Sequence, residues 1–312
     1  MRRNLFNILI LFIFTQASPV LGQNKYCLYE DYAIKAYQDK DYLIAKGYID
    51  TAITLCPDLL VNAYAWHIKG FIYQSLYYET DNKNSNSIYR DPAVEAFKRS
   101  LELDTLSREF ESMNKKAIGK LAKSYYNDAA VRIDTNNYLK AIEYYDLYKS
   151  TYVFGYPDYD FNQRDVVFYN VMGVVYEQKY YNNTKAFESF IFKSVESYEK
   201  TLAIDSLNYD ANQAIGFIYH NLGVEMILND LDDEGDLEMM MLYQEKSVEY
   251  FTKALPYLKK AYVLKPNSED VVRGMAAVYL SLHEYERYEL YMDVLEDLQN
   301  TEEQEAPIPD ND

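Results

Sequence analysis

Glycine and proline are scarce in this sequence of 312 residues, with 10 and 8 copies respectively. A sandwich or barrel of short strands needs turn-forming residues about every 8 to 12 positions. The scarcity therefore argues against such folds and favours a mostly helical chain. Hydrophobic residues make up 49% of the chain and charged residues 26%, which allows a large core and excludes a collagen-like or compositionally disordered chain.

The chain has fewer basic than acidic residues. Lys and Arg total 31 against 49 Asp and Glu, which gives a formal net charge of -18 at pH 7. Such a surface repels the phosphates of nucleic acids and the headgroups of anionic lipids. We therefore expect no nucleic-acid binding, and a protein or peptide partner that is basic or neutral.

Residues 1–22 have the pattern of a secretory signal peptide. Arg2 and Arg3 precede a mainly apolar run from Leu5 to Phe14, and small residues follow up to Gly22, where a signal peptidase would cleave. A membrane anchor is the alternative, but this run covers about half of the roughly 20 residues that cross a bilayer as a helix. We expect a periplasmic or secreted chain with no membrane span. Its net charge would be -20 after loss of the two arginines.

The sequence contains internal repeats. Three apolar segments share the pattern Gly-x-x-Tyr, at Gly70–Tyr73, Gly173–Tyr176 and Gly216–Tyr219. A second pattern, with a small, a large apolar and another small residue at helical spacing before a turn, recurs downstream. Its copies are Ala45-Ile49-Ala52-Pro57, Ala93-Phe97-Ser100-Thr105, Ser194-Tyr198-Thr201-Ser206 and Ala254-Leu258-Ala261-Pro266, with a looser one at Ala141, Tyr145 and Tyr148.

These positions resemble the tetratricopeptide repeat, a helical hairpin of about 34 residues with the signature W-x2-L-G-x2-Y, then A-x3-F, then P. Trp66, Gly70 and Tyr73 match the first half best, with Lys69 where the family has Leu. The resemblance implies an all-α solenoid, or superhelix, of stacked hairpins, in which small residues let the paired helices approach closely.

About six such repeats fit into residues 26–298, and the last contains Met275, Ala276 and Tyr279. Three repeats carry insertions. The polar run 81–87 predicts a solvated loop, whereas the long insertion between Tyr219 and Ala254 keeps apolar periodicity and predicts lengthened helices.

The expected organisation is a signal peptide over 1–22, the solenoid over 23–299 and a disordered acidic tail over 300–312. Repeats with lengthened helices that follow a signal peptide resemble the exported tetratricopeptide proteins of Bacteroidetes-type bacteria.

Cys27 and Cys56 are the two cysteines of the chain. In the repeat register, Cys27 stands at the start of the first helix and Cys56 at the end of the second, and antiparallel helices bring these ends together. We predict a disulfide between them, which would stabilise the fold by about 3.5 kcal/mol on the chain-entropy model. Two buried free thiols are the alternative.

Little in the sequence points to catalysis or to a cofactor. The repeat register separates the three histidines, His67, His220 and His283, by whole helical pairs, so they cannot converge on a zinc ion. The sequence has no nucleophile elbow, phosphate-binding glycine loop or HExxH pair. We expect a protein that is not an enzyme.

One acidic segment resembles a calcium loop. Its ligands would be Asp230, Asp232, Glu234 and Glu238. However, Met241 occupies the twelfth position, where a calcium loop has a bidentate Glu. The alternative is an acidic turn whose carboxylates favour the positive end of the next helix.

In the tetratricopeptide family the first helix of each pair lines the inner groove of the superhelix. The resemblance therefore assigns these groove residues: Tyr37, His67, Phe71, Tyr126, Asn170, Gln213, Phe217, His220 and Arg273. They are mainly aromatic and amide side chains, which suit adaptable contact with a partner. The clamp by which some relatives bind a C-terminal carboxylate is suggested only by Lys123 and Asn127.

The function expected from these observations is an exported scaffold that binds a protein or peptide of the cell envelope through its concave groove. The alternative is an accessory protein that binds glycans or nutrients by stacking groove tyrosines on sugar rings. A third possibility is a structural solenoid that stacks end to end.

Overall fold

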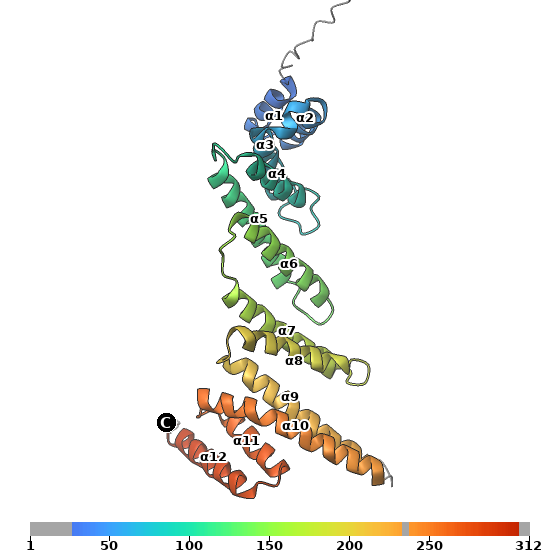
Figure 1. The fold of residues 1–312 in the computed structure, drawn as a ribbon, viewed down its shortest axis with the longest axis vertical. Coiled ribbons are helices and arrows are strands. Elements are labelled where there is room, and N and C mark those ends of the chain that lie inside the picture. The colour runs from blue at the N-terminus through green and yellow to red at the C-terminus, as the bar shows by residue number, and fades with distance from the viewer. Residues whose placement is uncertain (1–26, 233–236, 306–312) are drawn as a thin grey trace, which may run out of the picture. The chain divides into compact units, whose positions relative to one another are not determined.

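The computed structural model describes residues 27–232 and 237–305, and every regular element in these ranges is a helix (Figure 1). The predicted all-α fold is therefore confirmed. The α-helices are α1 (Leu28–Gln38), α2 (Tyr42–Leu55), α3 (Ala63–Ser75), α4 (Arg90–Leu103), α5 (Glu111–Ala130), α6 (Tyr138–Gly155), α7 (Asn162–Asn182), α8 (Ser189–Ile204), α9 (Tyr209–Asp232), α10 (Leu237–Leu264), α11 (Glu269–Ser281) and α12 (Tyr285–Glu305). A 3₁₀ turn, η1 (Pro57–Val61), precedes α3, and a π turn, η2 (Leu76–Thr80), follows it. The predicted signal peptide lies outside the described residues.

The chain divides into two compact units, one ending at Leu121 and the other beginning at Ala122, within α5. In the first unit α1 packs on α2, α2 on α3, and α3 on α4. In the second unit α7 packs on α8, and each following helix packs on the next as far as α12. Each unit is thus built from helical hairpins whose neighbours in sequence are neighbours in space.

The close approach of paired helices depends on the repeated glycines. A Cβ atom added to any of the three Gly-x-x-Tyr glycines would lie 2.5 to 2.7 Å from a side chain of the following helix, closer than packed atoms allow. The pairs are Gly70 with Phe97, Gly173 with Tyr198, and Gly216 with Leu258. The large partner is in each case the middle residue of the second sequence pattern, and the close approach of paired helices expected at the small residues is confirmed.

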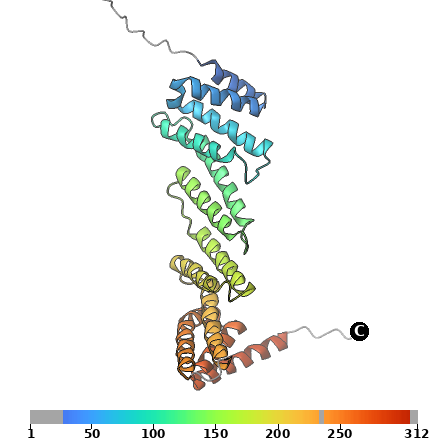
Figure 2. The same ribbon diagram turned by 90° about the vertical axis from the view of Figure 1, so that its right-hand side faces the viewer.

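The insertions take the form that the sequence predicts. The polar run 81–87 lies in the loop between η2 and α4, which is held by the buried Arg90, whose guanidinium donates to the carbonyl of Ser85 at 3.1 Å. The long insertion extends α9 and α10 to 24 and 28 residues, and these helices lie side by side (Figures 1 and 2).

At its end the described chain remains helical. α12 continues to Glu305, which carries the helix into the segment where composition predicts a disordered tail; residues 306–312 lie outside the described residues. None of the helices in the described ranges combines the length and the apolar character needed to cross a membrane.

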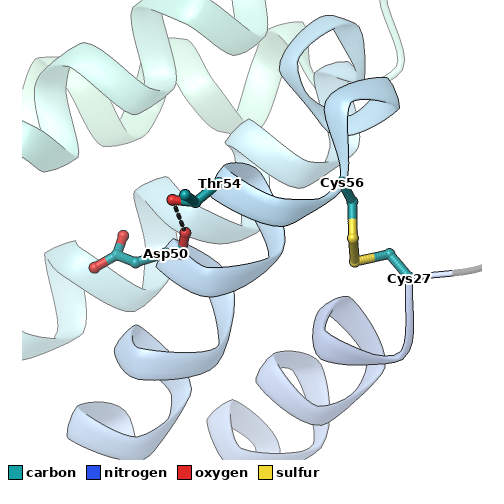
Figure 3. The surroundings of a disulfide bond; sticks show 4 residues. All are labelled: Cys27, Asp50, Thr54 and Cys56. Atoms are coloured by element: carbon teal, nitrogen blue, oxygen red, sulfur yellow. Dashed lines mark hydrogen bonds between the residues drawn. A yellow bond between two sulfur atoms is a disulfide. The ribbon is translucent and has the colours of Figure 1, made fainter.

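Cys27, directly before α1, is bonded to Cys56, directly after α2 (Figure 3). The two Cα atoms lie 6.2 Å apart across a sequence separation of 29 residues. A small cluster of Ala52, Leu59 and Ala65 packs beneath the bond. The structure therefore has the predicted pairing of the two helix ends.

Lys69 shows why one repeat tolerates a lysine where the tetratricopeptide signature has leucine. Its Nζ lies 3.0 Å from Oδ1 of Asp50 on α2, and over the rings of Trp66 and Tyr73. The hydroxyl of Tyr73 donates to Oδ2 of Asp50 at 2.6 Å. Burial alone would raise the pKa of Asp50, but Tyr73, Lys69 and Lys46 outweigh it and hold that pKa below its ordinary value. This network joins α2 to α3.

Candidate binding surface

α7 in the second unit carries apolar side chains on two sides. On one side Phe168, Met172 and Val175 are buried in the unit. On another side a row of residues repeats at spacings of four and three, and its apolar members are 38% to 53% exposed. We call this row the α7 stripe; its members are Val167, Val171, Val174, Gln178 and Tyr181.

The spacing places the whole stripe on one face of α7, because four and three residues are both close to one helical turn. A row with this spacing is the kind of seam on which a second helix packs. Covering a valine completely contributes about 1.5 to 3 kcal/mol, so each half-exposed valine of the stripe would contribute about 1 kcal/mol if a partner covered it.

A small cleft of about 30 Å³ lies on one flank of the stripe. It is lined by Tyr126, Ala129, Ala130, Ile133, Tyr145, Val167, Phe168 and Val171, from α5 to α7. Its floor is rigid because the rings of Tyr145 and Phe168 are stacked with their centroids 3.9 Å apart.

A larger cleft of about 340 Å³ lies at the other end of α7. Its lining comes from the end of α7 and the loop after it, from α8 and from α9: Tyr180, Tyr181, Thr184, Ile191, Ile218, Asn221, Leu222, Val224, Glu225 and Leu228. The lining is mainly apolar with a few polar groups, which is the usual composition of a site that receives an apolar group.

One wall of the larger cleft is acidic. The hydroxyl of Tyr180 donates to Oε2 of Glu225 at 2.8 Å. Burial, this hydrogen bond and the charges of Glu225 and Glu188 raise the pKa of Tyr180, so the hydroxyl stays protonated and remains a donor. A partner that inserts here would meet apolar side chains beside negative charge.

Ion pairs and stacked rings hold the start of α7. Asp165 accepts from the hydroxyl of Tyr145 at 2.7 Å and from Nζ of Lys149 at 3.0 Å. The guanidinium of Arg164 lies 4.9 Å from the ring centroid of Tyr126. These contacts fix α7 against α5 and α6, so the stripe and the small cleft are formed before any partner binds.

Glu177 is a partly buried carboxylate on α7. Its Oε2 accepts from the hydroxyl of Tyr198 on α8 at 2.9 Å. Burial raises the pKa of Glu177, and the hydrogen bond offsets only part of that rise. The folded protein therefore holds the proton of this side chain more tightly than the unfolded chain does.

Replacing Glu177 by glutamine is expected to raise the free energy of unfolding at pH 7 by a few tenths to about 1 kcal/mol. The folded pKa of Glu177 exceeds its unfolded value of about 4.5, so its contribution to stability is present below that value and is lost as the pH rises through the folded pKa. Glutamine keeps an oxygen for Tyr198 without the charge. Urea denaturation of both proteins at pH 7 and pH 4 measures the effect. If the variant gained the same free energy of unfolding at the two pH values, the raised pKa of Glu177 would not be the cause.

Two predicted groove residues lie at or beside the stripe. Tyr126 lines the small cleft. Asn170 lies between Val167 and Val171 in sequence, and its Nδ2 donates to Oδ1 of Asn208 at 3.1 Å.

The other predicted groove residues of the second unit are more scattered. Phe217 packs on Gly274 of α11, where an added Cβ would lie 2.6 Å from the ring. The ring of His220 lies 5.7 Å from that of Phe251, and burial lowers the pKa of His220. Phe217 and His220 thus pack between helices. Gln213 is half-buried, and Arg273 is exposed and paired with Glu269 at 3.3 Å.

In the first unit the three predicted groove residues also make internal contacts. His67 is buried, with Nδ1 2.7 Å from Oδ1 of Asn114. Phe71 contacts the rings of both His67 and Phe97. Tyr37 is half-buried, with its ring centroid 5.8 Å from that of Tyr42. The burial of His67 leaves it no surface to offer a partner.

The side chains of Asp230, Asp232 and Glu234, three of the four candidate calcium ligands, lie outside the described part of the chain. Glu238, the fourth, is exposed at the start of α10. Among the side chains that the structure describes, no group of three or more His, Cys, Asp or Glu is placed to hold a metal ion.

No family model matches this sequence, and no curated protein matches it. A solved structure that it resembles is the TPR2AB-domain:pHSP90 complex of yeast Sti1, at 12% identity over 87% of this chain and 89% of that chain, with a TM-score of 0.26. The helix pairing and the glycine contacts define the class of fold: an all-α protein of tetratricopeptide-like helical hairpins.

Proposed function

We propose that this protein is a non-catalytic scaffold that binds another protein or a peptide through the second unit. The observation that carries the proposal is the α7 stripe with a preformed cleft at each of two places along it. Single exposed apolar residues are common on protein surfaces, whereas a row of three exposed valines with clefts beside it is typical of an interaction site.

The side chains of the stripe and of its clefts indicate the chemistry of the partner. Apolar side chains at helical or extended spacing would cover the three valines of the stripe and enter the cleft beside Tyr181. The acidic wall at Glu225 and the net charge of -18 favour a partner that is basic or neutral. Sugar recognition is favoured less, because stacking on sugar rings needs exposed aromatic faces and the stripe offers only Tyr181.

We further propose that the chain is exported to the periplasm or secreted, and that it serves the cell envelope of a Bacteroidetes-type bacterium. The pattern of residues 1–22 supports this. The disulfide between Cys27 and Cys56 adds support, because disulfides persist in oxidising compartments. The state of these two thiols in the native host, considered in the Discussion, tests the compartment.

Replacing Val171 and Val174 together by aspartate is expected to weaken peptide binding at least about 30-fold, since two valines contribute about 1 kcal/mol each. The probe is a set of 15-residue peptides selected on the wild-type protein from a random display library. Their affinities for the variant are measured by fluorescence polarisation.

Val263→Asp is the matched control, because Val263 on α10 is exposed and lies outside both clefts. It should bind the selected peptides as the wild type does. If the stripe variant and the control lost equal affinity for the peptides, or if neither lost any, the α7 stripe would be refuted as the binding surface.

A further inference from the structure

The first hairpin has an uncovered outer face. Tyr29 and Tyr32 of α1 are 39% and 47% exposed, and the ring of Tyr32 lies 5.5 Å from that of Tyr48 on α2. This α1–α2 outer face consists of Leu28, Tyr29, Tyr32, Ile44, Gly47, Tyr48 and Leu55. It is apolar and aromatic, and none of these residues is charged.

The repeat register shows what kind of element such a face receives. Aligning the buried Ala33 with Gly70 places Tyr29 and Tyr32 at the positions of Trp66 and Lys69. In the second hairpin this side of α3 packs on α2, where Lys69 pairs with Asp50. The outer face of the first hairpin is therefore a stacking face for another helix, and Tyr29 and Tyr32 on it stay 39% and 47% exposed.

Gly47 lies on the same face and is an empty socket. A Cβ on Gly47 would meet no atom within 4 Å. At five other helical glycines an aromatic ring or a leucine lies within 3 Å of the added Cβ; they are Gly70, Gly173, Gly216, Gly223 and Gly274. Within the described chain, large side chains thus cover these five glycines and leave Gly47 open.

We propose that two copies of this protein pair through their α1–α2 outer faces, with a tyrosine of each copy seated on Gly47 of the other. One face carries both the aromatic side chains and the glycine socket, and this is the self-complementarity that a two-fold interface requires. The contact would repeat between copies the packing that Gly70 and Phe97 make within one copy.

Charge selects this pairing over stacking of the first hairpin on α12. The chain carries a net charge of -18, and none of the seven residues of the α1–α2 outer face is a carboxylate. The sequence of α12 has eight acidic residues and one arginine, and covering such a helix with an uncharged face would desolvate its charges at a cost. The disulfide joins the ends of α1 and α2 (Figure 3), so the face is preformed.

Sedimentation velocity over a range of concentrations tests the proposal, with the disulfide-bonded chain from Gln23 onward. A concentration-dependent dimer is expected. Gly47→Arg fills the socket in a place where the monomer has open space, and should raise the dissociation constant of the dimer at least about 100-fold. Circular dichroism and the fluorescence of Trp66 verify that this variant is folded.

Leu106→Arg is the control, because Leu106 is 99% exposed and lies outside the face. The dimer of this variant should have the same dissociation constant as the wild-type dimer. A wild-type chain that stays monomeric at high concentration would overturn the proposal. A dimer that Gly47→Arg leaves intact would overturn it too, since the chains would then associate through another surface.

Discussion

Replacing Gly70 by valine is expected to lower the free energy of unfolding of the first unit by about 3 kcal/mol. Even the first carbon of the new side chain would lie 2.6 Å from the ring of Phe97. Phe97 is completely buried, so the ring cannot move aside and the two helices must separate. The valine's better helix propensity offsets only a fraction of this cost.

The single tryptophan of the chain, Trp66, lies one turn before Gly70 on α3. Its fluorescence in urea therefore follows the first unit without interference from the second. Gly47→Ala is the matched control. It is also a glycine within a helix of this unit, but its Cβ meets open space, so the substitution should raise stability by about 0.5 to 1 kcal/mol. If both variants lowered stability alike, close packing at Gly70 would not be the cause.

The repeat pattern made the helix pairs predictable because a glycine and its large partner must both be present for two helices to touch. The structure shows such pairs in Gly173 with Tyr198 and in Gly216 with Leu258; the sequence patterns indicated paired helices but did not assign these contacts. The same reasoning predicted the lengthened α9 and α10, since apolar periodicity has to continue wherever two helices go on packing.

The binding surface was less predictable. The position of a residue within the repeat predicts that it lies on the groove side of its helix. It does not predict whether a neighbouring helix covers that side. His67 and Phe217 were assigned to the groove, yet they pack on Asn114 and Gly274 respectively. Their large rings span the distance to the next element, and so they fill the space between helices.

The α7 stripe was missed for the opposite reason. α7 carries a second apolar row displaced from the buried one by one residue, which is about 100° around the helix, so the apolar side chains cover a wide arc and the sequence does not show which part of it is exposed. The run Val166-Val167 and the pair Val174-Val175 were the available signal. Adjacent apolar residues in a helix point in different directions, so only one of each pair can face the core.

Removing the disulfide by replacing Cys27 and Cys56 with serine is expected to lower the free energy of unfolding of the first unit by about 3.5 kcal/mol. The bond closes a loop with a sequence separation of 29 residues, and without it the unfolded chain regains the freedom of that loop. The loss falls on a hairpin whose outer tyrosines, Tyr29 and Tyr32, are 39% and 47% exposed, so few other contacts compensate. Urea denaturation followed by Trp66 measures the change.

The double-serine variant and the wild type in dithiothreitol should unfold at the same urea concentration, and dithiothreitol should not affect the variant. A loss below about 1 kcal/mol would mean that packing of Ala52, Leu59 and Ala65 already restrains these helix ends. The oxidation state of the same two cysteines also tests whether the protein is exported. In chain isolated from its host without reductant, an exported protein should resist alkylation at both cysteines until it is reduced, whereas free thiols in freshly isolated chain would refute export.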